Sequence, residues 1–233
     1  MGAEKKFDES FQTGRYTLRE EFNRLPQLNA SIGVATNLDW EVLGTNADDT
    51  VIALDEGGGV SLTTKTGAND QVILCPHLDT AQSAWAKAGL WGTENSVRFE
   101  AKIKTGSAVT AQTLWAGLKK TNTSVIATDT DQIFFRYDPA VCSYWTLVHS
   151  RSNVDATFIT NIAPAASTNY VLVIEIDADR KVHAWINDVQ ITNMGQLAAL
   201  TDAVDLYPFV GVETTTTAAK NLKVRHIECS RAN

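Results

Sequence analysis

An alternating stretch in the middle of the chain decides the fold: Ser96-Val97-Arg98-Phe99-Glu100-Ala101-Lys102-Ile103-Lys104. Apolar side chains occupy every second position, and the positions between them are polar or charged. Because successive side chains of a β-strand point to opposite faces of a sheet, the pattern predicts a strand with one face in a core and the other in solvent. A second layer of structure must cover the apolar face.

Similar short apolar runs, separated by turn residues, occupy much of the remaining chain. We expect strands at residues 71–75, 112–118, 132–137, 144–149, 156–159, 170–177, 181–191, 208–213 and 221–229. Residues 51–54 and 60–64, joined across Glu56-Gly57-Gly58-Gly59, are typical of a β-hairpin. The later helical candidate is 195–200. The sequence therefore predicts an all-β fold, as two stacked antiparallel sheets or as a barrel.

The composition restricts the class of protein further. A chain of 233 residues with 44% hydrophobic and 20% charged residues is typical of one globular sandwich domain. Its 20 basic and 27 acidic residues give a net charge of -7, which disfavours binding to nucleic acid. The apolar runs are too short for a signal peptide or a membrane span, so we expect no membrane partner.

The first 30 residues carry denser charge than the rest. We expect an arm over residues 1–30 and a sandwich over residues 31–233. Within the arm, Thr17-Leu18-Arg19-Glu20 fits a capping box, in which a Thr hydroxyl and a Glu carboxylate each satisfy a backbone N–H at the start of a helix. A short helix is therefore predicted to begin here.

An apolar stripe follows on this predicted helix. Leu18, Phe22 and Leu25 fall at positions i, i+4 and i+7, and Pro26 ends the helix because it lacks a backbone donor. A helix of about two turns is marginal alone. The stripe is thus expected to dock either on the sandwich or on a partner, which makes these three residues the candidate partner-binding site.

One cluster of acids resembles a catalytic arrangement. Glu175, Asp177 and Asp179 alternate along the chain, a spacing that would let them line one cleft and divide the acid and nucleophile roles of a glycoside hydrolase. Asp177 and Asp179 lie in Asp177-Ala178-Asp179-Arg180, which is typical of a turn between two strands. We interpret them as solvated turn acids, with catalysis as the alternative.

Other candidate sites are weaker. Asp129, Asp131 and Asp138 flank a strand, and we interpret them as solvated turn acids, with a calcium site as the alternative. The histidines lack the spacing of zinc ligands: His77, His149, His183 and His226. No catalytic, metal-binding or cofactor-binding residue is predicted.

The tryptophans and cysteines each permit a core interpretation. Trp115, Trp145 and Trp185 lie in strand-like runs, where they either fill the core or form an exposed platform for sugars or a partner. The other tryptophans are Trp40, Trp85 and Trp91. The odd set of cysteines has no CxxC spacing, so buried thiols are expected: Cys75, Cys142 and Cys229.

A resemblance to known domains rests on residues 170–191. The chain resembles concanavalin A-like and laminin G-like domains in two successive stretches: Tyr170-Val171-Leu172-Val173-Ile174-Glu175-Ile176-Asp177 and Val182-His183-Ala184-Trp185-Ile186-Asn187-Asp188. The resemblance covers roughly residues 40–231 and implies a two-sheet antiparallel sandwich, or jelly roll. Glucanases of the laminarinase type carry Glu-x-Asp-x-x-Glu or Glu-x-Asp-x-Glu here, and Asp179 departs from that pattern where their proton donor stands.

A narrower resemblance joins four segments. Residues 40–46, 71–80, 115–118 and 127–132 resemble virion proteins of tailed bacteriophages, which decorate the capsid or form part of a fibre. This implies a non-enzymatic structural protein located in the virion, whose arm binds the major capsid protein or another virion protein, and which forms a homo-oligomer. The alternative is a glycan-binding tail-fibre or adhesin module, and the third hypothesis is a laminarinase-type glucanase.

Overall fold

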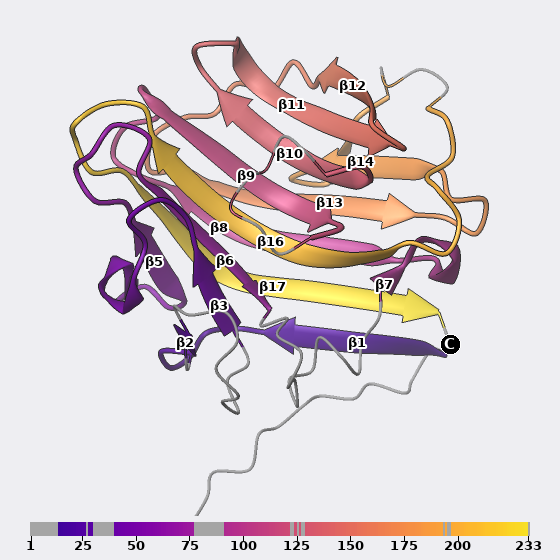
Figure 1. Ribbon diagram of the computed structural model, residues 1–233, viewed down its shortest axis with the longest axis horizontal. Helices are drawn as coiled ribbons and strands as arrows, with labels where there is room; N and C mark the ends of the chain where they lie inside the picture. The colour runs from indigo at the N-terminus through magenta and orange to yellow at the C-terminus, as the bar shows by residue number, and fades with distance from the viewer. Residues whose placement is uncertain are drawn as a thin grey trace, which may run out of the picture.

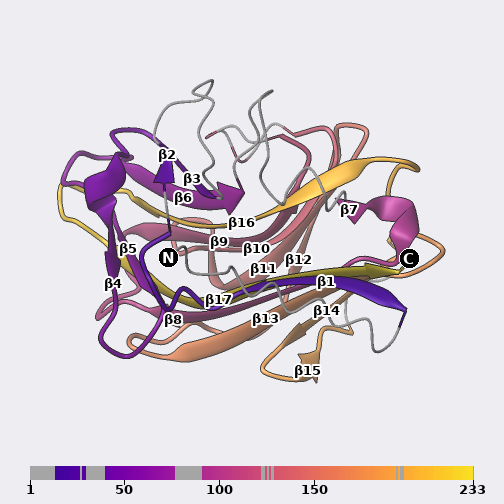
Figure 2. The same ribbon diagram turned by 90° about the horizontal axis from the view of Figure 1, so that it is seen from below.

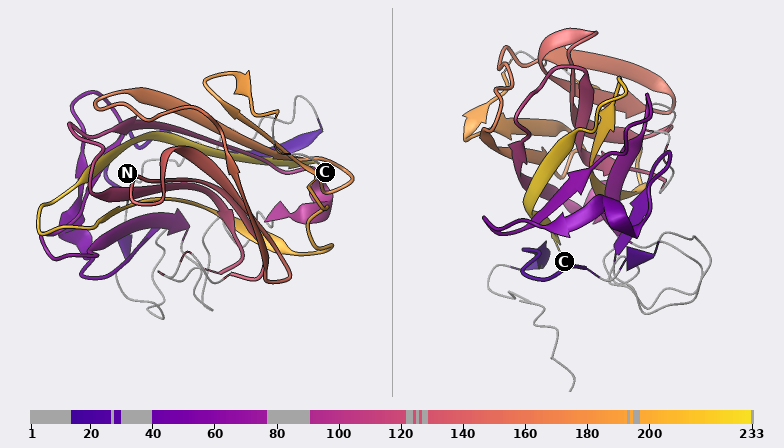
Figure 3. Two further views of the ribbon diagram at one scale, coloured as in Figure 1. Left: turned by 90° about the horizontal axis from the view of Figure 1, so that it is seen from above. Right: turned by 90° about the vertical axis from the view of Figure 1, so that its left-hand side faces the viewer.

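Two stacked β-sheets make up the part of the chain that the structure describes. This computed structural model describes residues 14–26, 28–29, 40–76, 91–121, 124, 126, 129–192, 194 and 197–232. Neighbouring strands are antiparallel, apart from one short parallel pair, and the sheets form two curved layers (Figures 2 and 3). The predicted all-β sandwich is confirmed.

The first layer is an eight-stranded sheet. Its order is β15 (Val189–Gln190), β14 (Val182–Ile186), β13 (Asn169–Ile176), β8 (Arg98–Thr105), β17 (Asn221–Ala232), β5 (Val60–Thr63) and β4 (Ile52–Leu54). β1 (Arg15–Glu20) also pairs with β17 (Figure 1). The predicted hairpin is confirmed, because β4 and β5 pair antiparallel across the glycine-rich turn.

The second layer is a nine-stranded sheet. Its order is β12 (Val154–Ile159), β11 (Cys142–Arg151), β10 (Gln132–Asp138), β9 (Gln112–Lys119), β16 (Asp205–Thr214), β6 (Gln71–Pro76), β3 (Trp40–Leu43) and β2 (Leu28–Asn29). β7 (Trp91–Gly92) pairs with the start of β16. Two 3-10 turns, Asp49–Val51 and Thr93–Asn95, precede β4 and β8.

The core lies between the two layers and follows the alternation of the sequence. In and beside β8, the inward residues Val97, Phe99, Ala101 and Ile103 are fully buried. The intervening residues of β8 lie on the outer face of the sheet, so the half-buried strand predicted at residues 96–104 is confirmed.

The helix predicted from Thr17 is wrong, because residues 15–20 form β1. This strand pairs with β17 in unbroken register from Arg15↔Ala232 to Glu20↔Ile227. The segment also has a period of two, with Tyr16 and Leu18 packed against the core. A two-turn helix was marginal, whereas a strand at this edge gains both a ladder of backbone hydrogen bonds and a buried face. The division of the chain at residue 30 stays a prediction.

The three residues of the predicted stripe do not share one surface. Leu18 and Phe22 are buried in the chain's own core, whereas Leu25 is 48% exposed. The Glu20 carboxylate accepts a hydrogen bond from the backbone N–H of Phe22 at 2.9 Å, so it stabilises the turn after β1 and not a helix start. Partner binding by these residues stays a prediction, for which Leu25 is the accessible member.

Two further expectations need correction. The strand predicted at residues 181–191 is interrupted after Ile186, because Asn187 and Asp188 both adopt positive φ and turn the chain into β15. This is the geometry of a two-residue hairpin turn, which Asn and Asp tolerate. Residues 197–200 are not helical, and residues 195–196 lie outside the described residues.

Truncation of Leu18 and Leu25 should separate core from surface. We expect Leu18→Ala to lower the free energy of unfolding by about 2–4 kcal/mol, because it leaves a cavity beneath β1. Leu25→Ala should change it by less than about 0.5 kcal/mol. Chemical denaturation of both variants measures the difference, and equal effects would contradict the placement of β1.

Candidate functional site

The acid cluster suspected from the sequence is divided between a surface ion pair and a turn. Glu175 lies on β13 with its Oε1 atom 3.2 Å from Nε of Arg98. Asp177 follows the strand, and its Oδ1 atom accepts hydrogen bonds from the backbone N–H groups of Asp179 and Lys181, each at 2.9 Å. The predicted hairpin turn is confirmed. Glu175 and Asp177 therefore have the contacts expected of structural residues, and Asp179 is exposed.

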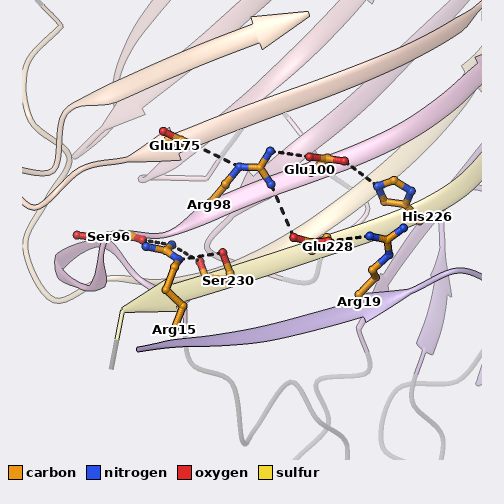
Figure 4. A network of polar contacts seen from close by, with 9 residues as sticks. All are labelled: Arg15, Arg19, Ser96, Arg98, Glu100, Glu175, His226, Glu228 and Ser230. Carbon is orange, nitrogen blue, oxygen red and sulfur yellow. Dashed lines mark hydrogen bonds and ion pairs between the residues drawn. The ribbon is translucent and has the colours of Figure 1, made fainter. Parts of the chain in front are cut away.

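Glu175 belongs to a charged network on the outer face of the eight-stranded sheet (Figure 4). Glu100 and Glu228 stand directly opposite each other on β8 and β17, a like-charge pairing that would destabilise the sheet. The Arg98 guanidinium lies 2.6 Å from Glu100 and 3.7 Å from Glu228. His226 Nε2 is 2.9 Å from Glu100, and Arg19 Nη1 is 3.4 Å from Glu228. Arg98 and Arg19 thus flank the carboxylate of Glu228, and Arg98 and His226 flank that of Glu100.

The network also attaches the edge strand. Arg19 reaches Glu228 from one end of β1, while at the other end Arg15 Nη2 donates to the backbone carbonyls of Ser96 at 2.6 Å and Ser230 at 3.2 Å. Each of these contacts joins residues that are distant in the sequence. We therefore assign this network to the stability of the sheet.

The opposite outer surface, on the nine-stranded sheet, carries a groove of about 460 Å³. Outward-facing side chains of several adjacent strands line it. The polar and aromatic side chains discussed below are Gln71, Thr113, Trp115, Arg136, Asp138 and Glu213. They share one face because each alternates with an inward core residue of the same strand, as Trp115 does with Leu114 and Ala116.

The register of the sheet brings the polar residues of the groove together. Glu213 on β16 stands between Gln71 on β6 and Thr113 on β9. In the next row of side chains, Trp115 stands between Gly211 and Arg136. The groove thus has a row of hydrogen-bonding groups beside an aromatic ring and a guanidinium.

Two glycines allow close packing on this face, Gly211 beside the Trp115 ring and Gly117 against the backbone of β10. A Cβ atom at Gly211 would lie 3.2 Å from Cε3 of Trp115, and one at Gly117 would lie 2.4 Å from Cα of Phe134. Trp115 packs with Phe134 and Phe209 in a second apolar cluster outside the main core, and it is 6% exposed. Its interpretation as a buried packing residue is confirmed, although it also lines the groove.

Glu213 and Arg136, two charged residues of the groove, differ in their hydrogen-bond partners. Burial raises the pKa of Glu213; a hydrogen bond from Gln71 opposes this rise, and the charge of Asp138 adds to it. Gln71 Nε2 donates to Oε2 of Glu213 at 2.5 Å. Arg136 has no ion pair or side-chain hydrogen bond to any residue that the structure describes, and its Nε atom is buried. Such a group needs an acceptor, which a ligand can provide.

Sequence reasoning did not find Arg136, Gln71 or Glu213. The available signal was the charge of Arg136 inside the apolar run Gln132-Ile133-Phe134-Phe135-Arg136-Tyr137. An arginine within such a strand must lie on its outer face, since the alternate positions are buried. What the sequence could not show is that the outer faces of β6, β16 and β10 are neighbours.

The acids considered for calcium do not form one site. Asp129 accepts hydrogen bonds from Thr121 and lies 3.9 Å from Nζ of Lys119, whereas Asp138 stands at the far end of β10. Among the residues that the structure describes, no group of three or more His, Cys, Asp or Glu side chains could hold a metal ion. The described residues thus do not support a shared calcium site for Asp129, Asp131 and Asp138. The interpretation as solvated turn acids is wrong for Asp129 and Asp131, which are only 6% and 3% exposed.

The remaining aromatic and titratable candidates fall into two groups. Trp40, Trp91 and Trp145 are buried in the core, as are the thiols of Cys75 and Cys229. Trp185, His183 and Cys142 are partly exposed, so the buried thiol expected at Cys142 is wrong. His77 and Trp85 lie outside the described residues. No helix in the described ranges is long and apolar enough to cross a membrane.

Comparison with known proteins supports the fold. No protein-family model matches the chain, and no curated protein matches it. A solved β-glucanase from Bacillus licheniformis is similar, with a TM-score of 0.58 and 8% identity over 91% of this chain and 96% of that chain. Alginate lyase A1-II′, of polysaccharide lyase family 7, has a TM-score of 0.56 and 11% identity over 84% and 95%.

A third similar structure is the carbohydrate recognition domain of Emp46p, in its potassium-bound form. Its TM-score is 0.56, with 8% identity over 82% of this chain and 88% of that domain. At these identities the likeness shows the fold alone: a concanavalin A-like jelly-roll sandwich. Similar structures thus include enzymes that act on polysaccharides and a carbohydrate-binding domain.

The charged network makes a prediction about acid stability. A hydrogen bond from His226, opposed by burial and reinforced by Arg98, lowers the pKa of Glu100 from 4.5 to about 2. A carboxylate with a depressed pKa in the folded state stabilises the fold above its unfolded pKa, and this stability is lost as the pH falls from about 4.5 to about 2. Between pH 6 and pH 3, Glu100→Gln should therefore lose less stability than the unmodified protein.

Denaturant titrations at the two pH values measure this effect. Glu56→Gln, at an exposed position on the β4–β5 turn, is the matched control and should retain the pH dependence of the unmodified protein. The same acid sensitivity in Glu100→Gln would contradict the assigned role of Glu100.

Proposed function

We propose that this protein binds a saccharide chain in the groove of the nine-stranded sheet, without cleaving it. The observation that carries the proposal is the Arg136 guanidinium, which lies in the groove beside Trp115 with no partner among the described residues. The side chain is partly exposed, so a ligand in the groove can place oxygen atoms against the guanidinium.

The mixture of groups in the groove favours sugar hydroxyls. Arg136 only donates hydrogen bonds, ionised Asp138 only accepts them, and Gln71 and Thr113 do both. A hydroxyl can donate and accept, so adjacent sugar hydroxyls match such a set. The rim of Trp115 supplies an apolar contact for a sugar ring.

The charge of the protein favours a neutral saccharide. The chain has a net charge of -7, and Asp138 and Glu213 line the same groove as Arg136. These carboxylates would repel a polyanionic chain and would leave Arg136 as its single described cationic contact in the groove. The similar structures support a saccharide in general, because two are named for polysaccharide substrates and the third is a carbohydrate recognition domain.

Substitution of Arg136 tests the proposal. On an array of neutral and acidic oligosaccharides, we expect the protein to retain a neutral class, and calorimetry gives its Kd. Arg136→Gln should weaken that binding roughly tenfold or more, because hydrogen bonds from a charged donor are lost. Arg136→Lys should restore part of it, since the charge remains but the planar fork of donors is lost.

Arg24→Gln is the matched control, because Arg24 is exposed and lies away from the groove residues. It should bind like the unmodified protein. Retention of no glycan, or equal effects of the Arg136 and Arg24 substitutions, would refute the proposal. Cleavage of the bound glycan that is lost in Glu213→Gln would replace binding by catalysis, whereas cleavage lost in Glu175→Gln would restore the glucanase hypothesis.

Our second proposal is a structural role in a tailed-phage virion, as a capsid decoration or fibre protein that forms homo-oligomers. The segments that resemble phage virion proteins include β3, β6 and β9, which lie in the sheet that carries the groove. On the edge strand β12, Val154 and Ile159 are 71% and 45% exposed, which favours a contact with another virion subunit. Residues 1–13, Leu25 and this edge are the proposed attachment surfaces to a capsid protein.

Copy number in purified phage particles tests the virion proposal. Hundreds of copies per particle would indicate decoration of the head, and a handful would indicate a fibre. Removal of residues 1–13, which leaves β1 in place, should yield a folded protein that no longer attaches. Absence from particles would refute the proposal, and normal attachment of the truncated protein would refute the role of these residues.

A further inference from the structure

The groove of the nine-stranded sheet holds more negative than positive charge. Asp138, Asp155 and Glu213 line it, and Arg136 is the one cation of its described lining. Asp155 accepts a hydrogen bond from the Ser150 hydroxyl. Neither Asp138 nor Glu213 forms an ion pair with a residue that the structure describes. These two carboxylates are therefore available to a positively charged group of a ligand.

Glu213 and Asp138 lie at one end of the groove, on either side of Thr113. Glu213 on β16 is the register partner of Thr113 on β9. On the other side of β9, Tyr137 of β10 stands opposite Leu114, and Asp138 follows it beside Thr113. The three strands are consecutive in the sheet (Figure 1). Because neighbouring strands are about 4.8 Å apart, the two acids have backbones about 10 Å apart, with the threonine between them.

Thr113 contributes a hydroxyl without a partner. The residue is only 5% exposed, yet its Oγ1 atom forms no hydrogen bond with any residue in the described ranges. Neither this atom nor Oε1 of Glu213 is fully buried, so a ligand in the groove can reach both. Asp138 uses Oδ1 to accept a hydrogen bond from the backbone N–H of Ala140 at 3.0 Å, which leaves Oδ2 for a ligand. The three side chains thus offer three acceptor oxygens.

The surroundings of Glu213 also call for a positive charge. Burial raises the pKa of Glu213, and the charge of Asp138 adds to this rise against the hydrogen bond from Gln71. Both effects disfavour the ionised carboxylate. A cation placed between Glu213 and Asp138 would offset their repulsion and would favour the ionised form of each.

A protonated amine matches these acceptors better than a hydroxyl does. An ammonium group has three N–H donors and a positive charge, whereas a hydroxyl has one donor and no charge. Its three donors suit Glu213, Thr113 and Asp138, and hydrogen bonds between charged groups are the stronger kind. Two residues farther along the strands, about 7 Å away, Trp115 and Arg136 form the next row of the groove. One saccharide chain can therefore contact both rows.

We propose that this end of the groove selects a saccharide that carries a free amino group, with the ammonium against Glu213, Thr113 and Asp138. The inference rests on the proposed function, because it requires a saccharide chain in the groove, and it specifies the class of sugar as an amino sugar. Hydroxyls of the same chain lie against Arg136. A neutral chain binds the groove more weakly, since it leaves two carboxylates without a countercharge.

Three tetrasaccharides with one β-1,4-linked backbone test the inference. Chitosan tetraose carries an amine at C2 of each sugar, cellotetraose carries a hydroxyl there, and chitin tetraose carries an uncharged acetamide. At about pH 6.5, an amine that titrates like an α-amino group is protonated. We expect the full-length protein to bind chitosan tetraose at least about tenfold more tightly than the other two. Calorimetry at about 0.15 M salt, which screens contacts with distant surface charges, measures each Kd.

Substitutions assign the preference to this end of the groove. Glu213→Gln and Asp138→Asn should each lower the ratio of the cellotetraose Kd to the chitosan tetraose Kd at least about fivefold, because each removes one charge. Thr113→Val keeps the shape and removes the hydroxyl, so the ratio should fall roughly threefold. Glu56→Gln is the matched control: it removes an exposed charge on the other sheet and should keep the ratio. Thermal unfolding verifies the fold of each variant.

Several results would overturn the inference. These are no binding of chitosan tetraose, an affinity for it no greater than for cellotetraose, and a preference that survives in both Glu213→Gln and Asp138→Asn. An equal loss of preference in Glu56→Gln would indicate attraction to the whole acidic surface and would also overturn it. If Glu213→Gln does not fold, the partly exposed Asp138 decides through Asp138→Asn.

Failure of the proposed function gives a different result. If Arg136→Gln binds cellotetraose and chitosan tetraose as the unmodified protein does, saccharide binding in the groove is refuted. If Arg136→Gln weakens both tetrasaccharides and the unmodified protein binds them equally, the proposed function stands and the amino-sugar preference is refuted.

Discussion

The alternation of side chains along each strand is the constraint on which this structure depends. In the central strands, every second residue fills the core between the two sheets, so the intervening residues must form the outer faces. The outer faces therefore differ according to which residues those strands carry there. On the eight-stranded sheet they form a network of ion pairs around Arg98, and on the nine-stranded sheet they form an apolar cluster bordered by a groove.

The charged side chains of the two outer faces differ in whether they have partners within the protein. On one face, Glu100 and Glu228 are opposed across the register, and Arg98, Arg19 and His226 surround them, so each charge in the network has a partner. On the other face, Arg136 has none within the described chain. A charged side chain that is satisfied contributes to the fold, whereas one left unsatisfied beside a groove is available to a ligand. This contrast separates the structural surface from the candidate binding surface.

The sequence predicted those parts of the fold that one segment determines by itself. Alternation at residues 96–104 and the glycine-rich turn at 56–59 specify a strand and a hairpin locally, and Asp177 and Asp179 specify a turn. The prediction of a helix at residues 15–20 was wrong because the pattern of this segment fits both a helix and a strand. The choice between them depends on pairing with β17, about two hundred residues away. The groove was missed for a related reason: Gln71, Arg136 and Glu213 are brought together by sheet order. Sheet order depends on the whole chain and cannot be predicted from any one segment.

The pairing of β1 with β17 also has a consequence for biosynthesis. Arg15 and Ala232 are register partners, and β17 stands next to β8 in the interior of the eight-stranded sheet. Until residues 221–232 leave the ribosome, β1 and β8 both lack this neighbour and expose unpaired backbone edges. At about 5–20 residues per second, that interval lasts on the order of 10–40 s for the roughly two hundred intervening residues. The nascent chain thus carries unpaired strand edges, the feature that favours aggregation, until β17 emerges.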